Sequence, residues 1–210
     1  MSQVAYLIPG KREQTKVANR QAILDAAREV FGELGYETAT VRDIIRRTGL
    51  AAGTFYNYYR SKEEVFAALS DDGARRFAPI LKSLRASKPG FEGFVRAAIV
   101  AYFEFLADEH HTWVARRPAG EAHPQVRGET PEMAAVFGEV RSAIESALAG
   151  RENAADVDYM TAACIAIARD VGDRMLARRP VDTAAAADFA VGMILNGLRG
   201  QPDAQAAAQR

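Results

Sequence analysis

The stretch Gly49–Glu64, GLAAGTFYNYYRSKEE, places tyrosine hydroxyls beside cationic side chains. Tyr56 and Tyr58 come first, and Arg60 and Lys62 follow closely behind them. A tyrosine can pack its ring on a protein surface while its hydroxyl reaches a phosphate oxygen, and a lysine offers that phosphate an opposite charge. These residue types at this spacing therefore favour contact with a polyanion.

The histidines offer a competing chemistry. On a helix, His110 and His111 would project about 100° apart, so the pair cannot easily share one metal ion, and His123 is remote in sequence. The chain lacks a His-Glu-x-x-His motif, a phosphate-binding glycine loop and a Gly-x-Ser-x-Gly turn. We therefore expect no metal, no cofactor and no catalytic residue. The alternative is a small all-helical enzyme that uses His110, His111 or carboxylates in a central chamber.

Charge is unevenly distributed along a chain with 27 basic and 27 acidic side chains. Residues 1–62 hold ten Lys and Arg against six Asp and Glu, a net charge of +4. The remaining residues hold 17 basic and 21 acidic side chains, a net charge of −4. Such a division indicates that one end contacts a polyanion. It argues against a sequence-independent architectural DNA binder, a class that tends to be basic throughout.

The composition predicts a cytoplasmic protein. The longest apolar runs, such as Ala162–Ala168 and Ala97–Phe103, are too short to span a bilayer, so we expect no membrane contact. The first residues contain no apolar core of signal-peptide length. Cys164 is the single cysteine, which excludes a disulfide framework.

The hydrophobic pattern predicts an all-α fold. We expect helices over residues 15–34, 41–48, 51–58, 62–86, 91–109, 131–149, 154–177 and 182–198. Thr40 is a suitable N-cap, Gly35 and Gly49 suit helix ends, and Ser61 with Glu64 forms a capping-box pattern. The two short helices, joined by a tight turn at Gly49, form a helix-turn-helix unit, whose second helix enters the DNA major groove.

Three ordered motifs carry a family resemblance: AILDAAREVFGELGY, TVRDI and GTFYNYYRSKEE, all within Gln21–Leu69. This segment resembles the TetR-type (TetR/AcrR) transcriptional regulators. The resemblance implies a homodimer in which a small-molecule effector, bound in a C-terminal bundle, releases the protein from a palindromic DNA operator. Repression is the usual activity of the family. The chain departs from the family pattern at Ala51, where serine is common, and at Ile45, where a small residue is favoured.

The resemblance, together with the helix pattern of the sequence, indicates a domain organisation. An N-terminal arm, residues 1–14, is expected to be flexible, and residues 15–62 would form the DNA-binding domain. Residues 63–199 would bind ligand and dimerise, and residues 200–210 would form a disordered tail.

By position, the resemblance also implies DNA contacts. Phosphates would be held by Thr40, Tyr56, Tyr58 and Lys62. Base edges would be read by Arg42, Ala52, Gly53, Thr54 and Asn57. Because small residues lead the second helix of the unit, we expect Arg42, Thr54 and Asn57, together with DNA shape, to carry most of the specificity. For Lys62 there is a separate argument, since a cation in the first turn of a helix is unfavourable unless an anion is bound there.

Aromatic residues that follow the DNA-binding segment predict an apolar chamber for the effector, with simple core packing as the alternative. The chamber would be lined by Phe77, Leu81, Phe94, Tyr102, Phe105, Leu106, His110, Trp113, Arg116, Met133 and Phe137. The stretch YFEFLADEHHTWVARRP is also similar to regulators of fatty-acid desaturation and synthesis. That resemblance implies an acyl-CoA or fatty-acid effector.

Two stripes of apolar and small residues predict a four-helix dimer interface. They consist of Met160, Cys164, Ile167 and Val171 on one helix and Phe189, Met193, Ile194 and Gly197 on the last. The alternative is that both stripes only complete the core of the protomer.

Overall fold

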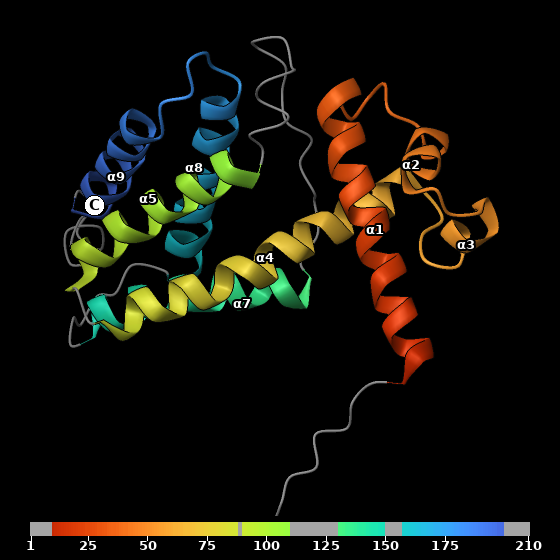
Figure 1. Cartoon of the computed structure of the whole chain (residues 1–210). Helices are drawn as coiled ribbons and strands as arrows, with labels where there is room; N and C mark the ends of the chain where they lie inside the picture. The colour runs from red at the N-terminus through yellow and green to blue at the C-terminus, as the bar shows by residue number, and fades with distance from the viewer. Residues whose placement is uncertain (1–9, 88–89, 110–129, 150–156, 200–210) are drawn as a thin grey trace, which may run out of the picture. The chain divides into compact units, whose positions relative to one another are not determined.

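The computed structural model describes residues 10–87, 90–109, 130–149 and 157–199, and within these ranges it contains helices and no strand (Figure 1). The expected all-α fold is thereby confirmed. The chain divides into two compact units, Met1–Leu69 and Ser70–Arg210.

Three helices and the first residues of a fourth build the first unit. They are α1 (Lys11–Leu34), α2 (Val41–Thr48), α3 (Ala52–Tyr56) and the start of α4 (Lys62–Ala86). Residues 11–14, expected to belong to a flexible arm, are helical, and Glu13 in the first turn is favourable for the helix dipole there. Residues 1–9 of that arm lie outside the described residues. The predicted end at Gly35 is confirmed, because its N–H donates to the Phe31 carbonyl at 3.0 Å.

The predicted cap of α2 is also confirmed. The Thr40 hydroxyl accepts from the Asp43 N–H at 3.3 Å, and the Asp43 carboxylate accepts from the Thr40 N–H at 3.1 Å. Gly49 ends the helix in the left-handed conformation, with φ of 68°. α3 is shorter than expected and has no side-chain cap, because Ala51 offers no oxygen to the first N–H groups.

The core of the first unit joins α1, α2 and α4 with Phe55 of α3 and with Tyr59, which follows α3. Its largest members are Ile23, Leu24, Val30, Phe31, Ile44, Phe55, Tyr59, Val65 and Phe66. Phe55 and Tyr59 are four residues apart and both are buried, as their spacing on one helical face predicts.

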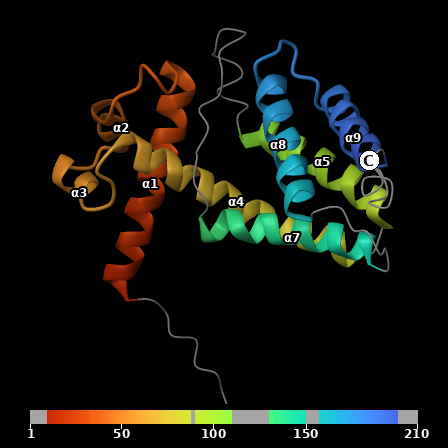
Figure 2. The same cartoon turned by 180° about the vertical axis from the view of Figure 1, so that it is seen from behind.

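The second unit contains the rest of α4 together with α5 (Gly90–Glu109), α7 (Pro131–Leu148), α8 (Val157–Leu176) and α9 (Thr183–Arg199). α5 packs against α9 and α8, and α8 packs against α7 (Figure 2). One core cluster centres on Phe103, Met175 and Val191, and a second centres on Phe77 and Leu81. No helix of the described ranges is both long enough and apolar enough to cross a membrane.

Candidate nucleic-acid interface

A tightly bonded turn sets the geometry of the two short helices α2 and α3. The Thr48 hydroxyl donates to the Ile45 carbonyl at 2.8 Å and accepts from the Leu50 N–H at 3.0 Å. With Gly49 in the left-handed conformation, these bonds end α2 and direct the chain into α3. The helix-turn-helix unit predicted from the sequence is therefore present as two helices joined by a fixed turn.

The outer side of α3 carries the residues expected to meet DNA. Ala52 and Tyr56 are four residues apart, as are Gly53 and Asn57, so each pair shares a face, and all four are exposed. Tyr56 is 55% exposed, although its ring packs edge-to-face on Phe55 with the ring centres 5.5 Å apart. The outer side of α3 is thus a surface of small residues, with the Tyr56 hydroxyl and the Asn57 amide at its edge.

Thr54 and Tyr58 each follow a residue of this surface in the sequence, and both are half-buried. Tyr58 is therefore less available to a phosphate than Tyr56. A Cβ added at Gly53 would meet no atom within 4 Å, so the backbone of α3 is open to close approach there.

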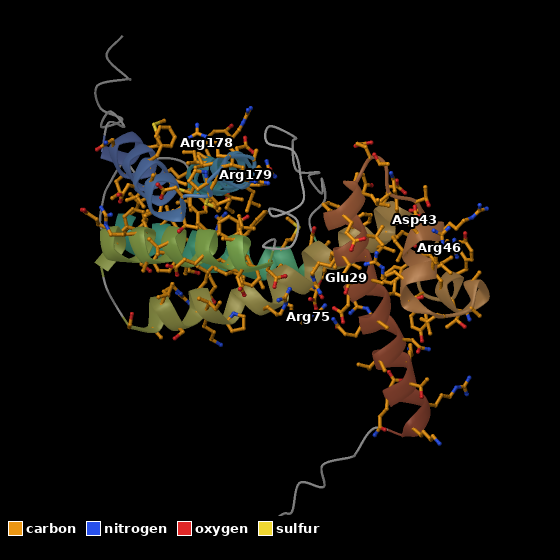
Figure 3. The ribbon with its side chains drawn as sticks, turned by 45° about the horizontal axis from the view of Figure 1, so that its top comes forward. Glu29, Asp43, Arg46, Arg75, Arg178 and Arg179 are labelled. Carbon is orange, nitrogen blue, oxygen red and sulfur yellow. The ribbon has the colours of Figure 1, made fainter. Side chains whose placement is uncertain are left out.

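Cations on α2 differ sharply in their partners. Arg42 is exposed, and the Arg46 side chain is 74% exposed, with Asp43 at 3.8 Å on the same helix (Figure 3). Arg47, in contrast, is bonded to Glu29 and Glu33 of α1. Sequence reasoning did not include Arg46 among the DNA contacts. Its position four residues after Arg42, on the polar side of an amphipathic helix, was the signal that could have identified it.

The Thr40 hydroxyl, expected to hold a phosphate, is already engaged within the protein. It donates to the Asp43 carboxylate at 2.5 Å while accepting from the Asp43 N–H. These hydrogen bonds hold the pKa of Asp43 below its usual value. Thr40 can donate to a phosphate only by leaving Asp43, so its observed role is to start α2.

Lys62 also has partners other than the phosphate predicted for it. Its Nζ lies 2.9 Å from the Tyr36 carbonyl oxygen, 3.1 Å from that of Glu37 and 3.3 Å from that of Ala39. It stands 4.6 Å from the centre of the Tyr36 ring. The sequence argument from the helix dipole missed these acceptors, which lie more than twenty residues earlier in the chain.

Most described residues of the predicted effector chamber pack against one another. Phe77 is buried, and the centre of its ring lies 5.3 Å from that of Tyr102 and 5.4 Å from that of Phe105. Leu81 and Phe94 are also buried, and Leu106 packs against the neighbouring cluster. This arrangement favours the core-packing interpretation for the rings.

Other members of the chamber set are less enclosed or lie elsewhere. Met133 and Phe137 are half-buried on α7. Burial raises the pKa of the Tyr102 hydroxyl, and the charge of nearby Asp173 adds to this effect. The predicted chamber residues His110, Trp113 and Arg116 lie outside the described residues, as do His111 and His123.

The predicted dimer stripes divide between the core and the surface. Met160 and Ile194 are buried, and Cys164, Ile167 and Val171 pack partly buried against the core of α5, α8 and α9. Burial raises the pKa of the Cys164 thiol to about 11.

The remaining members of these stripes are exposed. Phe189 is 61% exposed and Met193 is 52% exposed, and Gly197 is exposed as well. Tyr159, which sequence reasoning omitted, is 77% exposed on α8. Among the described residues, α8 and α9 thus carry large apolar side chains that stay exposed.

Metal ligands do not gather in the part of the chain that the structure describes. There, no group of three or more His, Cys, Asp or Glu residues is placed to hold an ion.

Comparison with known proteins links the first unit to a family. Residues 23–69 match the family model described as "Bacterial regulatory proteins, tetR family". The chain is 34% identical over 102 residues to the HTH-type transcriptional repressor Rv1474c of Mycobacterium tuberculosis. That match covers 48% of this chain and 52% of the relative, so the chain spans about half the length of the curated relatives it matches.

Solved structures share the fold over nearly their full length. The fatty acid degradation regulator FadR from Bacillus halodurans has a TM-score of 0.62 at 22% identity, covering 87% of this chain and 97% of its own. The transcriptional regulator FadR from Bacillus subtilis, in complex with stearoyl-CoA, has a TM-score of 0.66 at 18% identity, covering 84% and 98%. At such identities the likeness shows the fold alone. The relative Rv1474c is named as a repressor, so it gives no support to the alternative of a helical enzyme.

Proposed function

Because residues 23–69 match the model of the tetR family of bacterial regulatory proteins, we propose that the chain is a member of that family and a transcriptional repressor that binds double-stranded DNA. The observation that carries the proposal is the outer side of α3, where small residues flank an exposed tyrosine and asparagine. A helix with such a surface can approach base edges closely, because no bulky side chain separates its backbone from the groove.

The proposed contacts combine the exposure of Arg42, Tyr56 and Asn57 with the positions that the family resemblance implies for the half-buried Thr54 and Tyr58. Arg42, Thr54 and Asn57 read base edges, and Ala52 and Gly53 allow the close approach. Tyr56 and Tyr58 bind phosphates through their hydroxyl groups. The exposed Arg46 binds a phosphate through its positive charge. Phosphate contacts fix the register of the protein on the duplex, whereas base contacts select the sequence.

We further propose that two copies bind a palindromic operator. Two-fold symmetry in a dimer matches two-fold symmetry in DNA, so half-sites would be spaced by about one helical turn or a multiple of it. The exposed Tyr159, Phe189 and Met193 supply the apolar surface that a second copy would cover. Large aromatic residues and methionine are favoured in such interfaces.

The effector in this proposal is a small apolar or amphipathic molecule, with acyl-CoA or fatty acid as the candidate class. Support comes from the fold shared with the Bacillus subtilis regulator that was solved with stearoyl-CoA. The aromatic side chains of α4 and α5 would have to separate to admit an acyl chain, because their rings are in contact. Binding of the effector would release DNA.

Selection of random duplexes by the purified full chain, repeated across a salt series, tests the proposal. We expect a palindromic motif and an affinity that falls steeply with salt. Stearoyl-CoA, titrated against the selected duplex, should then release the protein. Failure to enrich any motif at low salt would contradict sequence-specific repression, and enrichment without release would remove acyl-CoA from the proposal.

A further inference from the structure

Lys62 lies at the start of α4, but its ammonium group points at the loop that precedes α2. We infer that Lys62 is a positioning residue, which ties α4 to this loop and thereby holds the first residue of α2 in place for DNA binding. The inference rests on the proposed function and changes the role of this lysine within it, from a phosphate contact to an internal anchor.

The anchor uses the full donor capacity of the lysine. An ammonium group has three N–H donors, and three carbonyl oxygens, those of Tyr36, Glu37 and Ala39, lie within 3.3 Å of Nζ. Hydrogen bonds from a charged donor are stronger than neutral ones. Ala39 is a buried residue, 2% exposed, so its carbonyl would lose a charged donor if the ammonium turned away to a phosphate.

The loop that supplies the carbonyls is itself held in shape. Gly35 has φ of 75°, and its carbonyl accepts from the Ala39 N–H at 3.1 Å, which closes the loop on itself. The Tyr36 ring packs against two aromatic residues, with its centre 5.3 Å from that of Phe31 and 5.0 Å from that of Phe66. The three carbonyls thus converge on one point because the loop is closed and its aromatic residue is packed.

The loop also contacts α4 at Glu63, the residue after Lys62. The Tyr36 hydroxyl lies 3.3 Å from the Glu63 carboxylate. Burial, followed by the charge of Glu63, raises the pKa of Tyr36. Lys62 and Glu63 therefore hold the two ends of the Tyr36 residue, its carbonyl and its hydroxyl.

The consequence for DNA binding follows from sequence position. Thr40, the N-cap of α2, is the residue after Ala39, so the last carbonyl of the anchor immediately precedes the helix. α2 leads through the bonded turn at Gly49 into α3. A displaced start of α2 would move the residues of α3 out of register with the bases, and such readout depends on precise placement.

Lys62→Ala separates the anchor from a phosphate contact. We expect operator affinity to fall about tenfold while the slope of log affinity against log salt stays at the wild-type value. A lost phosphate contact would instead reduce that slope by about 0.9 and weaken all duplexes equally. That second result would overturn the inference. Lys82→Ala, at an exposed lysine of the same helix, is the matched control for lost charge.

Chemical rescue provides a sharper readout. In Lys62→Ala, n-propylammonium replaces the missing atoms and can donate to the three carbonyls, whereas tetramethylammonium has the charge without an N–H donor. At constant total salt, n-propylammonium should restore operator affinity and tetramethylammonium should not. Equal effects of the two ions, or no effect of either, would contradict the anchor.

Hydrogen exchange without DNA keeps this inference separate from the proposed function. In Lys62→Ala, and in Lys62→Met, which keeps the aliphatic packing, amides of residues 36–43 should exchange faster than in the wild-type chain. If the wild-type chain selects no DNA but these amides respond, the proposed function fails and the anchor stands. Unchanged exchange in a folded variant would overturn the anchor.

Discussion

Arg47 of α2 and Glu33 of α1 form a two-pronged ion pair. Nη1 lies 3.1 Å from Oε1, and Nη2 lies 2.5 Å from Oε2. Glu29, one helical turn earlier, accepts from the same guanidinium at 2.7 Å. The planar guanidinium matches a carboxylate with two parallel bonds, so this pair fixes the contact between the first two helices more specifically than a single ion pair would.

Replacement of Arg47 should therefore weaken the first unit. We expect Arg47→Ala to lower the Tm by a few degrees, and Arg47→Lys to recover only part of the loss, because lysine cannot form both parallel bonds. The difference in Tm between the wild-type chain and Arg47→Ala should shrink at high salt, since exposed charges are screened. Arg96→Ala, which removes an exposed pair with Asp188 in the second unit, should have no measurable effect. Equal losses from both alanine variants would argue against a specific role for Arg47.

The hydrogen bonds between Asp43 and Thr40 should make the stability of the start of α2 depend on pH in acid. Hydrogen bonds from Thr40 lower the pKa of Asp43 below the ordinary value of 3.8, so the folded protein binds fewer protons than the unfolded chain in acid. The contribution to stability is complete above the ordinary pKa and is lost as pH falls through the lower pKa of the folded protein. Asp43→Asn should be less stable than the wild-type chain near neutral pH, and this difference should narrow in acid.

Chemical unfolding followed across that pH range would measure the effect, with Glu104→Gln, at an exposed position on α5, as the control. A difference between Asp43→Asn and the wild-type chain that stays constant from neutral to acidic pH would count against the capping box as its cause.

Two glycines of the helix-turn-helix unit should respond differently to alanine. At Gly49, φ of 68° is unfavourable for any residue with a Cβ, so Gly49→Ala should destabilise the protein by about 1 kcal/mol although the added atom has free space. Gly53 lies inside α3 with no such angle, and Gly53→Ala should leave stability unchanged or raise it slightly. Chemical unfolding of the two variants gives the comparison.

Gly53→Ala, the more stable of the two variants, should be the one that binds the operator more weakly. A methyl group at Gly53 would stand on the exposed side of α3, so we expect Gly53→Ala to lower operator affinity about tenfold while the fold is intact. Gly49→Ala should bind normally below its unfolding transition. Wild-type affinity in Gly53→Ala would mean that α3 does not approach the bases at this residue.

The exposed apolar side chains of α8 and α9 predict the oligomeric state. Met193→Glu should raise the dissociation constant of the dimer at least tenfold, because a charge would be buried without a partner in the interface. Val100→Glu, at an exposed apolar position on α5, is the control. Sedimentation over a dilution series measures both variants. A dimer that survives Met193→Glu with unchanged affinity would place the interface elsewhere.

Local features of this protein were predictable from sequence. Gly35 ends α1, Thr40 starts α2 and the spacing of Phe55 and Tyr59 fixes their burial, because each depends on bonds or geometry within a few residues. α3 is shorter than predicted mainly at its C-terminal end, which lies at Tyr56 and not at residue 58.

Partners distant in sequence were not predictable in the same way. The acceptors of Lys62 lie 23 to 26 residues earlier and converge only once the loop at Tyr36 has closed. Tyr102 packs against both core clusters of the second unit, so its helical spacing alone could not tell a chamber wall from a core residue. Burial of Met160 and Ile194 within the protomer likewise depends on how α8 and α9 turn toward α5.

The Phe31–Tyr36–Phe66 ring cluster has a consequence for exchanging DNA-binding modules between regulators of this architecture. Phe66 lies two residues beyond the GTFYNYYRSKEE motif, yet the centre of its ring is 5.9 Å from that of Phe31 and 5.0 Å from that of Tyr36. A chimera joined after Lys62 would carry the donor's readout residues but take a foreign side chain at this contact. The module boundary that preserves the cluster falls after Leu69, where the first unit ends.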